Sequence, residues 1–527
     1  MPLGSNRLYS DRVDYFHFMF PSRRLAYILA LVASNIIPFQ QPLRPVLPTI
    51  EGNVDYSLWR EQILRIDQML LQGGFETQFL EGCIQDWIVD VEAKGTKISA
   101  KAQRRFQDNT RKALRCNIAR ILLNEDFRGF SVRLADSPLL QNFCLVSQMD
   151  TIRVPSKSTL ERFSKWVPES RVRELVASIL RLGADHPQEL DLAEALDLET
   201  CFLDTSCVEA NIHFPVDWVL FRDATRTLMK AVRLIRDKGL RHRMEEPEEF
   251  LRRMNRLCIE MTHARTQADS QSKRKAVLRK MDRLLGTVRK HAQRYRDLLE
   301  GEWEKTGWTR PQTEQVLRRM DQVLDQLPAA RHQAKQRILE GELVDNAEKI
   351  LSLYEPEVCV IVRRKAGAEV EFGNTLLLGE SRQGLIIDWE YYAESAPADS
   401  KLTLKSVERM EKALGRAIAA VVGDRGFDSQ QNREELDERG TYNGICPRAP
   451  KDLRKRMGSA KFRELQTRRG QTEGRIAVFK RNILGGPLLS KGFEHRELTV
   501  SWAVLSHNLW VLARLPRAKR AAKRVAA

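Results

Sequence analysis

Three carboxylates of this sequence stand where acidic side chains commonly do chemistry. Asp204 lies in Cys201-Phe-Leu-Asp204-Thr-Ser-Cys-Val, a pattern that predicts a strand, a short turn and a second strand. Asp424 closes the apolar run Ala419-Ala-Val-Val-Gly-Asp424, which predicts a buried strand, a glycine turn and a helix starting near Ser429. A carboxylate at the end of a buried strand, beside a tight turn, is typical of sites in open α/β sheets.

Glu473, the third carboxylate, is an acidic residue in a basic segment. Residues 448–481 hold twelve Lys or Arg and three Asp or Glu. The apolar residues recur at helical spacing and predict an amphipathic helix, on which Arg469, Glu473 and Lys480 fall close to one face. Basic residues around one carboxylate suit a polyanion held against a metal ion. The alternative is an exposed helix whose i,i+4 ion pairs only support the helix.

Each of the two aspartates also has a purely structural interpretation. Asp204 could form a turn, and Asp424 could cap a helix. Asp388, in another predicted strand, is a rival second acid, but no phrase like the one around Asp424 surrounds it. Taken together, Asp204, Asp424 and Glu473 form a candidate Asp–Asp–Glu set.

The surroundings of the three acids resemble a known family. The matching pieces are the predicted strand with Asp204, the phrase Gly423-Asp424-Arg-Gly-Phe-Asp428, and Arg469-x3-Glu473-x6-Lys480. In this order they resemble the DDE transposases of bacterial insertion sequences, and the last piece resembles the Tyr-Arg-Glu-Lys signature of one large superfamily. The resemblance covers roughly residues 50–515 and is closest to the ISNCY type, which carries a large insertion after its first Asp. Gln466 stands where that signature has its tyrosine.

The resemblance implies a fold and a chemistry. The fold is α+β or α/β and multidomain, with an RNase H-like mixed sheet, flanking helices, a helical N-terminal domain and a long helical insertion. The chemistry is metal-dependent DNA strand cleavage and strand transfer in cut-and-paste transposition. Asp204 and Asp424 would share the metal ions, and Glu473 would complete the second site. The residues implied to bind DNA are Arg425, Arg469, Arg475, Lys480 and Arg481.

The donor set indicates which ion such a site would hold. Neighbouring carboxylates repel one another and raise one another's pKa, a cost that a divalent cation removes. Ligands that are all oxygen favour Mg²⁺ or Mn²⁺ over zinc. Two such ions about 4 Å apart clamp the attacking and leaving oxygens of a phosphodiester. We therefore expect two Mg²⁺ or Mn²⁺ ions.

Composition sets further bounds. The 527 residues carry a net charge of +17, which predicts an acidic partner. With the resemblance, that partner is double-stranded DNA, both element ends and target, bound by a homodimer on the nucleoid. Eight cysteines form no Cys-x-x-Cys pair, which argues against structural zinc and favours a reducing cytoplasm. The apolar run from Leu25 to Ala33 is too short to span a membrane, so no membrane contact is expected.

The chain divides into segments of different pattern. In the insertion, residues 215–344, we expect two long helices folded back as a hairpin. The basic residues of the first helix either keep its outer face in water or bind the flank of a DNA end. The predicted segments are an extension with a Pro-rich linker (1–50), a helical, helix-turn-helix-like DNA-binding domain (51–195), the catalytic domain (196–214 and 345–515), the helical insertion (215–344) and a basic tail (516–527).

Three alternatives remain open at this point. One is a catalytically silent DNA-binding protein derived from a transposase, although all three acids are present. Another is a different RNase H-like nuclease, against which the long insertion and the N-terminal helices argue. A purely structural helical scaffold is a third, and the acids on predicted strands argue against it.

Overall fold

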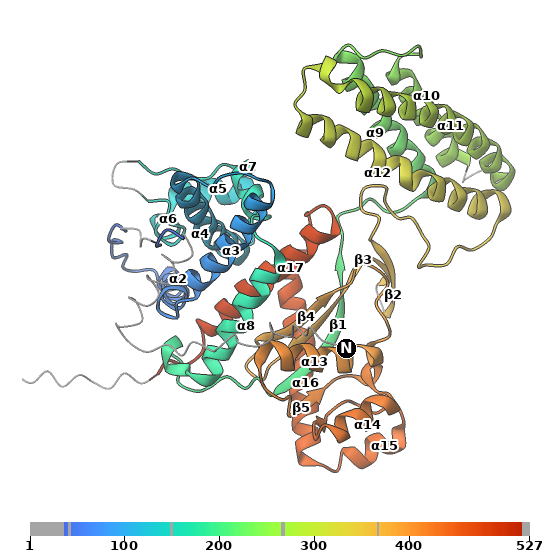
Figure 1. The fold of residues 1–527 in the computed structure, drawn as a ribbon. Coiled ribbons are helices and arrows are strands. Elements are labelled where there is room, and N and C mark those ends of the chain that lie inside the picture. The colour runs from blue at the N-terminus through green and yellow to red at the C-terminus, as the bar shows by residue number, and fades with distance from the viewer. Residues whose placement is uncertain (1–35, 40–43, 148–150, 265–268, 366–367, 519–527) are drawn as a thin grey trace, which may run out of the picture.

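The structure is a computed structural model of the chain. It describes residues 36–39, 44–147, 151–264, 269–365 and 368–518. The protein is mostly helical and carries a mixed sheet of six strands, which confirms the predicted mixed sheet with helices around it. Figure 1 shows the sheet between the N-terminal helices and a separate bundle of helices.

The strands take a different order in the sheet than in the chain. β3 pairs antiparallel with β1, β2 and β4, whereas β1 pairs in parallel with β5, and β5 with β6. The order is therefore β2-β3-β1-β5-β6, with β4 attached to β3. The strands are β1 (Thr200–Glu209), β2 (Cys359–Lys365), β3 (Ala368–Glu380), β4 (Ile386–Tyr391), β5 (Ala420–Val422) and β6 (Tyr442–Asn443).

β1 runs unbroken where the sequence predicts a turn. Its residues 202–209 pair one for one with residues 373–380 of β3, so Thr205 and Ser206 belong to the ladder. Small and β-branched side chains suit a pleated strand as well as a turn, and the partner strand decides between the two. The predicted turn after Asp204 is therefore wrong, and Asp204 lies in the middle of a central strand.

The N-terminal helices share a core with the sheet. The prediction of a helical region is confirmed, with Gly73 ending the first helix. The apolar core continues from these helices to the sheet because α17 (Phe493–Leu512) packs against α4, α8 and β4. The helices are α2 (Val54–Gln72), α3 (Phe75–Ala93), α4 (Ala100–Leu122), α5 (Phe127–Asp136), α6 (Pro138–Phe143), α7 (Lys157–Phe163), α8 (Glu169–Asp185) and the 3₁₀ turn η1 (Pro187–Leu190).

The insertion is a four-helix bundle with its own apolar core. The predicted hairpin is confirmed in its two long helices, α11 and α12, and two further helices pack against it. Thr309 and Gln312 form a capping box at the start of the last helix. The elements are α9 (Asp217–Asp237), α10 (Pro247–Ala264), α11 (Ser270–Glu302), η2 (Trp303–Thr306), α12 (Arg310–Lys335) and the π-helical turn η3 (Gln336–Glu340).

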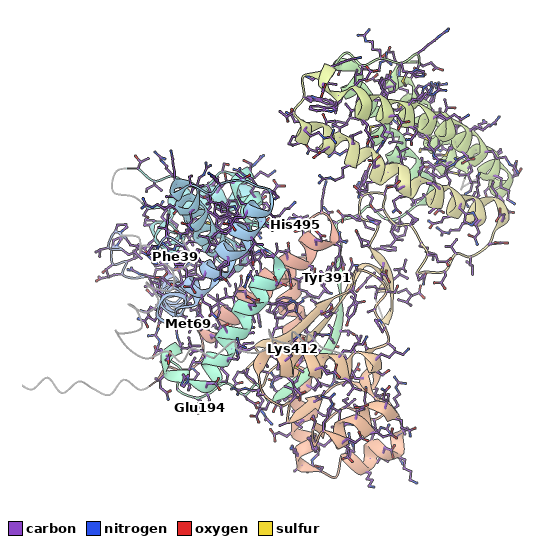
Figure 2. All side chains as sticks on the ribbon, viewed as in Figure 1. Phe39, Met69, Glu194, Tyr391, Lys412 and His495 are labelled. Atoms are coloured by element: carbon purple, nitrogen blue, oxygen red, sulfur yellow. The ribbon has the colours of Figure 1, made fainter. Side chains whose placement is uncertain are left out.

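Helices of the C-terminal half surround the sheet. The helix predicted after Asp424 is confirmed, and Ser429 caps it. Tyr391 stacks on Phe493 with ring centres 5.2 Å apart, while His495 shares a hydrogen bond with Ser164; together they join α17 to the sheet and to the N-terminal helices. Figure 2 labels Tyr391 and His495. The elements are η4 (Asp399–Lys401), α13 (Thr403–Leu414), η5 (Arg425–Phe427), α14 (Gln430–Glu438), α15 (Pro450–Arg456), α16 (Ala460–Val478) and the π-helical turn η6 (Phe479–Ile483).

The two ends of the chain are described only in part. Arg44, in the segment predicted as a linker, pairs with Asp67 of α2 at 2.6 Å. Residues 1–35, with the apolar run, and residues 519–527 of the basic tail lie outside the described residues. In the described part of the chain, no helix is long and apolar enough to cross a membrane.

Candidate functional site

The strand register brings the two aspartates together. β1 and β5 pair in parallel, with Phe202 opposite Val422. Asp204 lies two residues further along β1, and Asp424 lies two residues beyond the end of β5, where it caps the turn η5. Because strand side chains alternate between faces, Asp204 points to the face that carries Phe202.

Helix α16 covers that face and carries the third acid. Leu465 of α16 is fully buried against Phe202 and Val422. Arg469 and Glu473 follow Leu465 at intervals of four residues, about one helical turn each. They therefore continue the same helix face toward the two aspartates.

Asp424 and Glu473 both act electrostatically on Asp204. The pKa of the Asp204 carboxyl is raised to about 6, chiefly by burial and then by the charges of Asp424 and Glu473. A hydrogen bond from the Thr205 backbone N–H (2.8 Å) and the charge of Arg469 act in the opposite direction on this pKa. The three acids and Arg469 thus form one electrostatic group, here called the acidic cluster.

A fourth carboxylate lies beside Asp424. Asp424 caps the η5 turn, where its Oδ1 accepts a hydrogen bond from the Gly426 N–H at 2.7 Å. Asp399 accepts a hydrogen bond from the Thr205 hydroxyl at 3.1 Å. A side-chain carbon at Gly426 would stand 2.8 Å from Asp399 Oδ2 and 3.0 Å from Asp424 Oδ1, so a larger residue there would displace these carboxylates. No motif in the sequence singles out Asp399.

Glu473 is the most open member of the cluster. Its side chain is 63 % exposed and pairs with Arg469 at 3.1 Å. Among the described residues, no three His, Cys, Asp or Glu stand close enough to hold a metal ion. The oxygen donors suit a hard divalent ion, but Glu473 would first have to turn away from Arg469. An exposed ion pair is worth only about 0–1 kcal/mol, so this rearrangement costs little.

Gln466 anchors α16 at the level of the aspartates. Its Nε2 donates to the carbonyl oxygens of Gly444 (2.7 Å) and Gly423 (3.3 Å), which follow β6 and β5. Its Oε1 accepts a hydrogen bond from Arg469 Nε at 3.2 Å. Gln466 therefore ties the helix to the strand ends and holds Arg469. In the sequence it stood out only as a departure from the family signature.

A buried carboxylate holds the same helix from β3. Glu380 Oε1 accepts hydrogen bonds from Arg475 (2.6 Å) and Arg468 (3.1 Å), and the Glu380 side chain is 5 % exposed. Arg468 also lies over the ring of Phe202, 4.8 Å from its centre. Arg475, predicted to bind DNA, thus pairs with a buried partner in the protein.

The other residues predicted to bind DNA lie directly after Asp424 in the chain and in the turn that follows α16. Arg425 follows Asp424 directly and is exposed. Lys480 and Arg481 lie in η6, the π-helical turn that continues α16. In the described part of the chain, none of these three basic side chains forms an ion pair. Their contact with DNA stays a prediction.

Asp388, the rival second acid, is fully engaged in structure. It is buried in β4, where it accepts hydrogen bonds from the Ser406 hydroxyl (2.5 Å) and from Arg409 (2.7 and 3.0 Å). These contacts fix α13 on the sheet and leave Asp388 out of the acidic cluster.

Comparison with known proteins adds no relative. No family model, no curated protein and no solved structure matches this chain. The function has to be argued from the geometry of the site.

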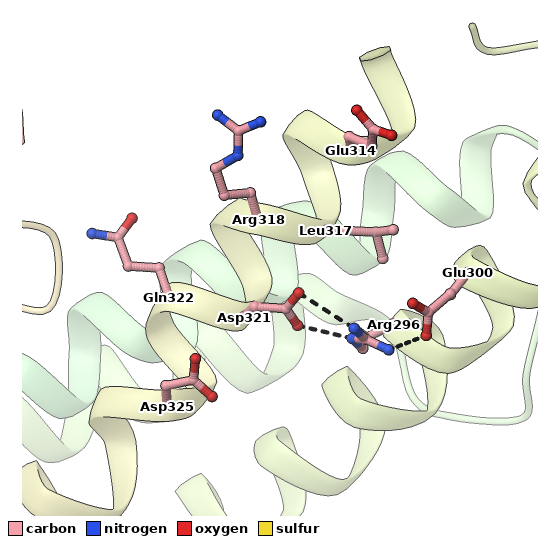
Figure 3. A pocket seen from close by; sticks show the side chains of 8 residues that line it. All are labelled: Arg296, Glu300, Glu314, Leu317, Arg318, Asp321, Gln322 and Asp325. Atoms are coloured by element: carbon pink, nitrogen blue, oxygen red, sulfur yellow. Dashed lines mark hydrogen bonds and ion pairs between the residues drawn. The ribbon is translucent and has the colours of Figure 1, made fainter. Parts of the chain in front are cut away.

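A hollow of about 580 Å³ lies on the insertion, between α11 and α12. Figure 3 shows Arg296 between Asp321 and Glu300; it donates to Asp321 Oδ1 at 2.8 Å and also pairs with Glu300. The side chains that line it are Arg296, Glu300, Glu314, Leu317, Arg318, Asp321, Gln322 and Asp325. The hollow shares no residue with the acidic cluster, and its lining holds four acidic side chains against two arginines.

Proposed function

We propose that this protein is a DDE-type transposase, which cleaves DNA strands and transfers them with the acidic cluster as its catalytic centre. The observation that supports this proposal is that Asp424 and Glu473 both act electrostatically on Asp204, whose strand pairs in parallel with the strand before Asp424 and packs against the helix that bears Glu473. The partner is double-stranded DNA at the element ends and the target, and two copies of the chain would hold two ends together on the nucleoid.

Each residue of the cluster has a role in this proposal. Asp204 and Asp424 would hold Mg²⁺ or Mn²⁺ between them, and Glu473 would complete the second position after it leaves Arg469. When bound, such a pair of ions activates the attacking oxygen and stabilises the leaving oxygen of a phosphodiester. Arg469, released from Glu473 and still held by Gln466, would then neutralise a phosphate beside the cut.

The electrostatics of Asp204 support this assignment. Its raised pKa means that, without a cation, keeping this carboxyl group ionised costs free energy in the folded protein. A divalent cation would lower that pKa and remove the repulsion from Asp424 and Glu473. Carboxylates whose pKa is raised by burial and by neighbouring acids are common at functional sites, although ion-pair networks also perturb pKa values.

The direct test is cleavage of DNA that flanks the coding sequence, in the presence of Mg²⁺ or Mn²⁺, followed on a denaturing gel. The variants Asp204→Asn, Asp424→Asn and Glu473→Gln should each abolish cleavage while the DNA is still bound. Glu464→Gln is the matched control, because Glu464 is also an exposed acid on α16 but pairs with Arg382 outside the cluster. Normal cleavage by any one of the three variants would remove that residue from the site.

A second candidate is a transposase-derived protein that binds DNA without cutting it. The exposed Glu473, paired with Arg469, favours it, as does the finding that no three His, Cys, Asp or Glu side chains of the described residues stand close enough to hold a metal ion. The same gel decides between the two. A wild-type protein that binds the flanking DNA but leaves it intact with either ion would favour the silent protein.

A further inference from the structure

The positive charge of the protein is concentrated in the inserted bundle. Residues 215–344 contain 29 Lys and Arg against 19 Asp and Glu, a net charge of +10 out of +17 for the whole chain. Helix α11 alone holds ten of these basic residues against four acidic ones. The excess is therefore largely a property of one helix.

The charges of α11 are ordered along its solvent face. Its buried side chains, such as Leu278, Leu285 and Ala292, pack into the core of the bundle. Arg279, Arg283 and Lys290 are all exposed. At about 100° per residue they fall within an arc of roughly 40°, opposite the buried face. We call these three residues the basic stripe.

Acids near the stripe are already paired with other cations. Glu260 of α10 pairs with Lys280 at 3.7 Å. Asp282 accepts from two residues of α12, Arg331 at 2.6 Å and Lys335 at 3.1 Å. Within the described residues, no member of the stripe forms an ion pair; Arg283 donates only to the Arg279 carbonyl. The positive charge of the stripe is therefore not neutralised within the described protein and can bind an acidic partner.

Gly286 keeps the middle of the stripe open. It lies on the same face, between Arg283 and Lys290. A side-chain carbon at Gly286 would meet only the Arg331 guanidinium, at 3.9 Å. The Arg331 guanidinium of α12 thus lies beside the stripe near Gly286. A row of exposed guanidinium and ammonium groups suits a phosphate backbone.

We propose that the basic stripe is a docking surface for the backbone of duplex DNA outside the cut site. Arg279 and Lys290 are about 16 Å apart along the helix axis, at 1.5 Å per residue, so the stripe can neutralise several phosphates. The choice of DNA rests on the proposed function. The contact itself requires only a regular row of phosphates, so it is independent of base sequence.

The test compares two triple variants of the full-length protein. Arg279→Ala, Arg283→Ala and Lys290→Ala remove the stripe. Arg233→Ala, Arg252→Ala and Arg318→Ala remove the same charge elsewhere on the bundle; the first two pair with acids at 3.1 and 2.9 Å, and the third stands among acids in the hollow. Alanine is favourable on exposed helix faces, so both variants should fold, as circular dichroism would verify.

Binding to a labelled duplex of arbitrary sequence is followed by fluorescence anisotropy at several salt concentrations. The plot of log affinity against log salt should flatten by about 2–3 units in the stripe variant, at roughly 0.9 per phosphate contact, and by less than about one unit in the control. Equal flattening in both variants would overturn the proposal, because net charge alone would then account for binding.

Two further measurements separate this proposal from the proposed function. If the stripe variant loses slope while the wild-type protein cuts no DNA, the docking surface stands and the catalytic proposal fails. If wild-type protein cuts DNA and the stripe variant keeps the wild-type slope, the catalytic proposal stands and the docking surface fails. An equal loss of slope with duplex RNA, combined with no DNA cleavage, would overturn the choice of DNA as the partner.

Discussion

The polar contacts that hold α16 and those of the inserted bundle differ in their surroundings. Around α16, one buried carboxylate, Glu380, receives two arginines of the helix, and Gln466 reaches the ends of two strands. At the surface of the bundle, pairs such as Arg233–Glu248 have both side chains about half exposed. Buried polar contacts fix geometry because breaking them is costly, whereas exposed pairs contribute little. The sheet region is thus built to position a helix, and the bundle to present charge.

Removal of Glu380 should give the largest change in stability. In Glu380→Ala, Arg468 and Arg475 lose their shared partner, and Arg468 is only 12 % exposed. We expect the free energy of unfolding to fall by about 2–4 kcal/mol, within the lower range for breaking a buried pair because Arg475 is 39 % exposed. Urea denaturation measures this loss.

The matched control for Glu380 is Asp321→Ala in the bundle. Asp321 also accepts from an arginine at a distance of 2.8 Å, but its side chain is 37 % exposed. Its loss should cost only about 0–1 kcal/mol. A similar loss of unfolding free energy in the two variants would show that the burial of Glu380 does not matter. The contrast between the two regions would then be wrong.

A smaller effect is expected from the titration of Asp204 in the metal-free protein. Burial raises its pKa to about 6, against about 3.9 in an unfolded chain. The folded state therefore binds this proton more tightly than the unfolded state. Protonated Asp204 therefore stabilises the fold at low pH. The free energy of unfolding should fall by about 1–3 kcal/mol as the pH rises from about 4 to about 6, and then level off.

The control variants for this titration come from both regions. Asp204→Asn cannot titrate, so its unfolding free energy should lack this fall, whereas Asp321→Asn in the bundle should keep it. Urea denaturation at several pH values between about 4 and 7 compares the three proteins. A wild-type profile parallel to that of Asp204→Asn would contradict the raised pKa.

Local features of the site could be predicted from the sequence, and the contacts that assemble it could not. The strand before Asp424, the helix that starts near Ser429 and the helix of Glu473 follow from short patterns, and all three are present. The turn after Asp204 was predicted wrongly because Thr and Ser suit turns and strands alike, and only the distant strand β3 decides.

Contacts between distant residues explain what the sequence left hidden. Glu380 meets Arg468 and Arg475 across 88 and 95 residues, and no local pattern marks such a pair. Asp399 reaches the cluster from a short turn without a motif. The additional helices α9 and α10 were missed although their apolar residues recur at helical spacing, as Leu228, Val232 and Ile235 do in α9.

The smallest expected effect belongs to Lys480, at the end of α16. The prediction that Lys480 shares a face with Arg469 and Glu473 assumes a regular α-helix, but Lys480 lies in the π-helical turn η6, where one extra residue per turn changes the phase. Among the described residues, none forms an ion pair with Lys480. Its removal in Lys480→Ala should therefore leave the melting temperature almost unchanged. If Lys480 binds a phosphate, the plot of log affinity against log salt should flatten by about one unit.

The control for Lys480 is Arg454→Ala on α15, a basic residue outside the acidic cluster. Fluorescence anisotropy with DNA that flanks the coding sequence gives the slope for both variants, and a thermal scan gives the melting temperature. A Lys480→Ala protein that keeps the wild-type slope but melts several degrees lower would make Lys480 a structural residue of the π-helical turn. That result would confine the phosphate contacts of α16 to Arg469 and its neighbours, because the turn would then belong to the rigid framework that Glu380 and Gln466 hold in place.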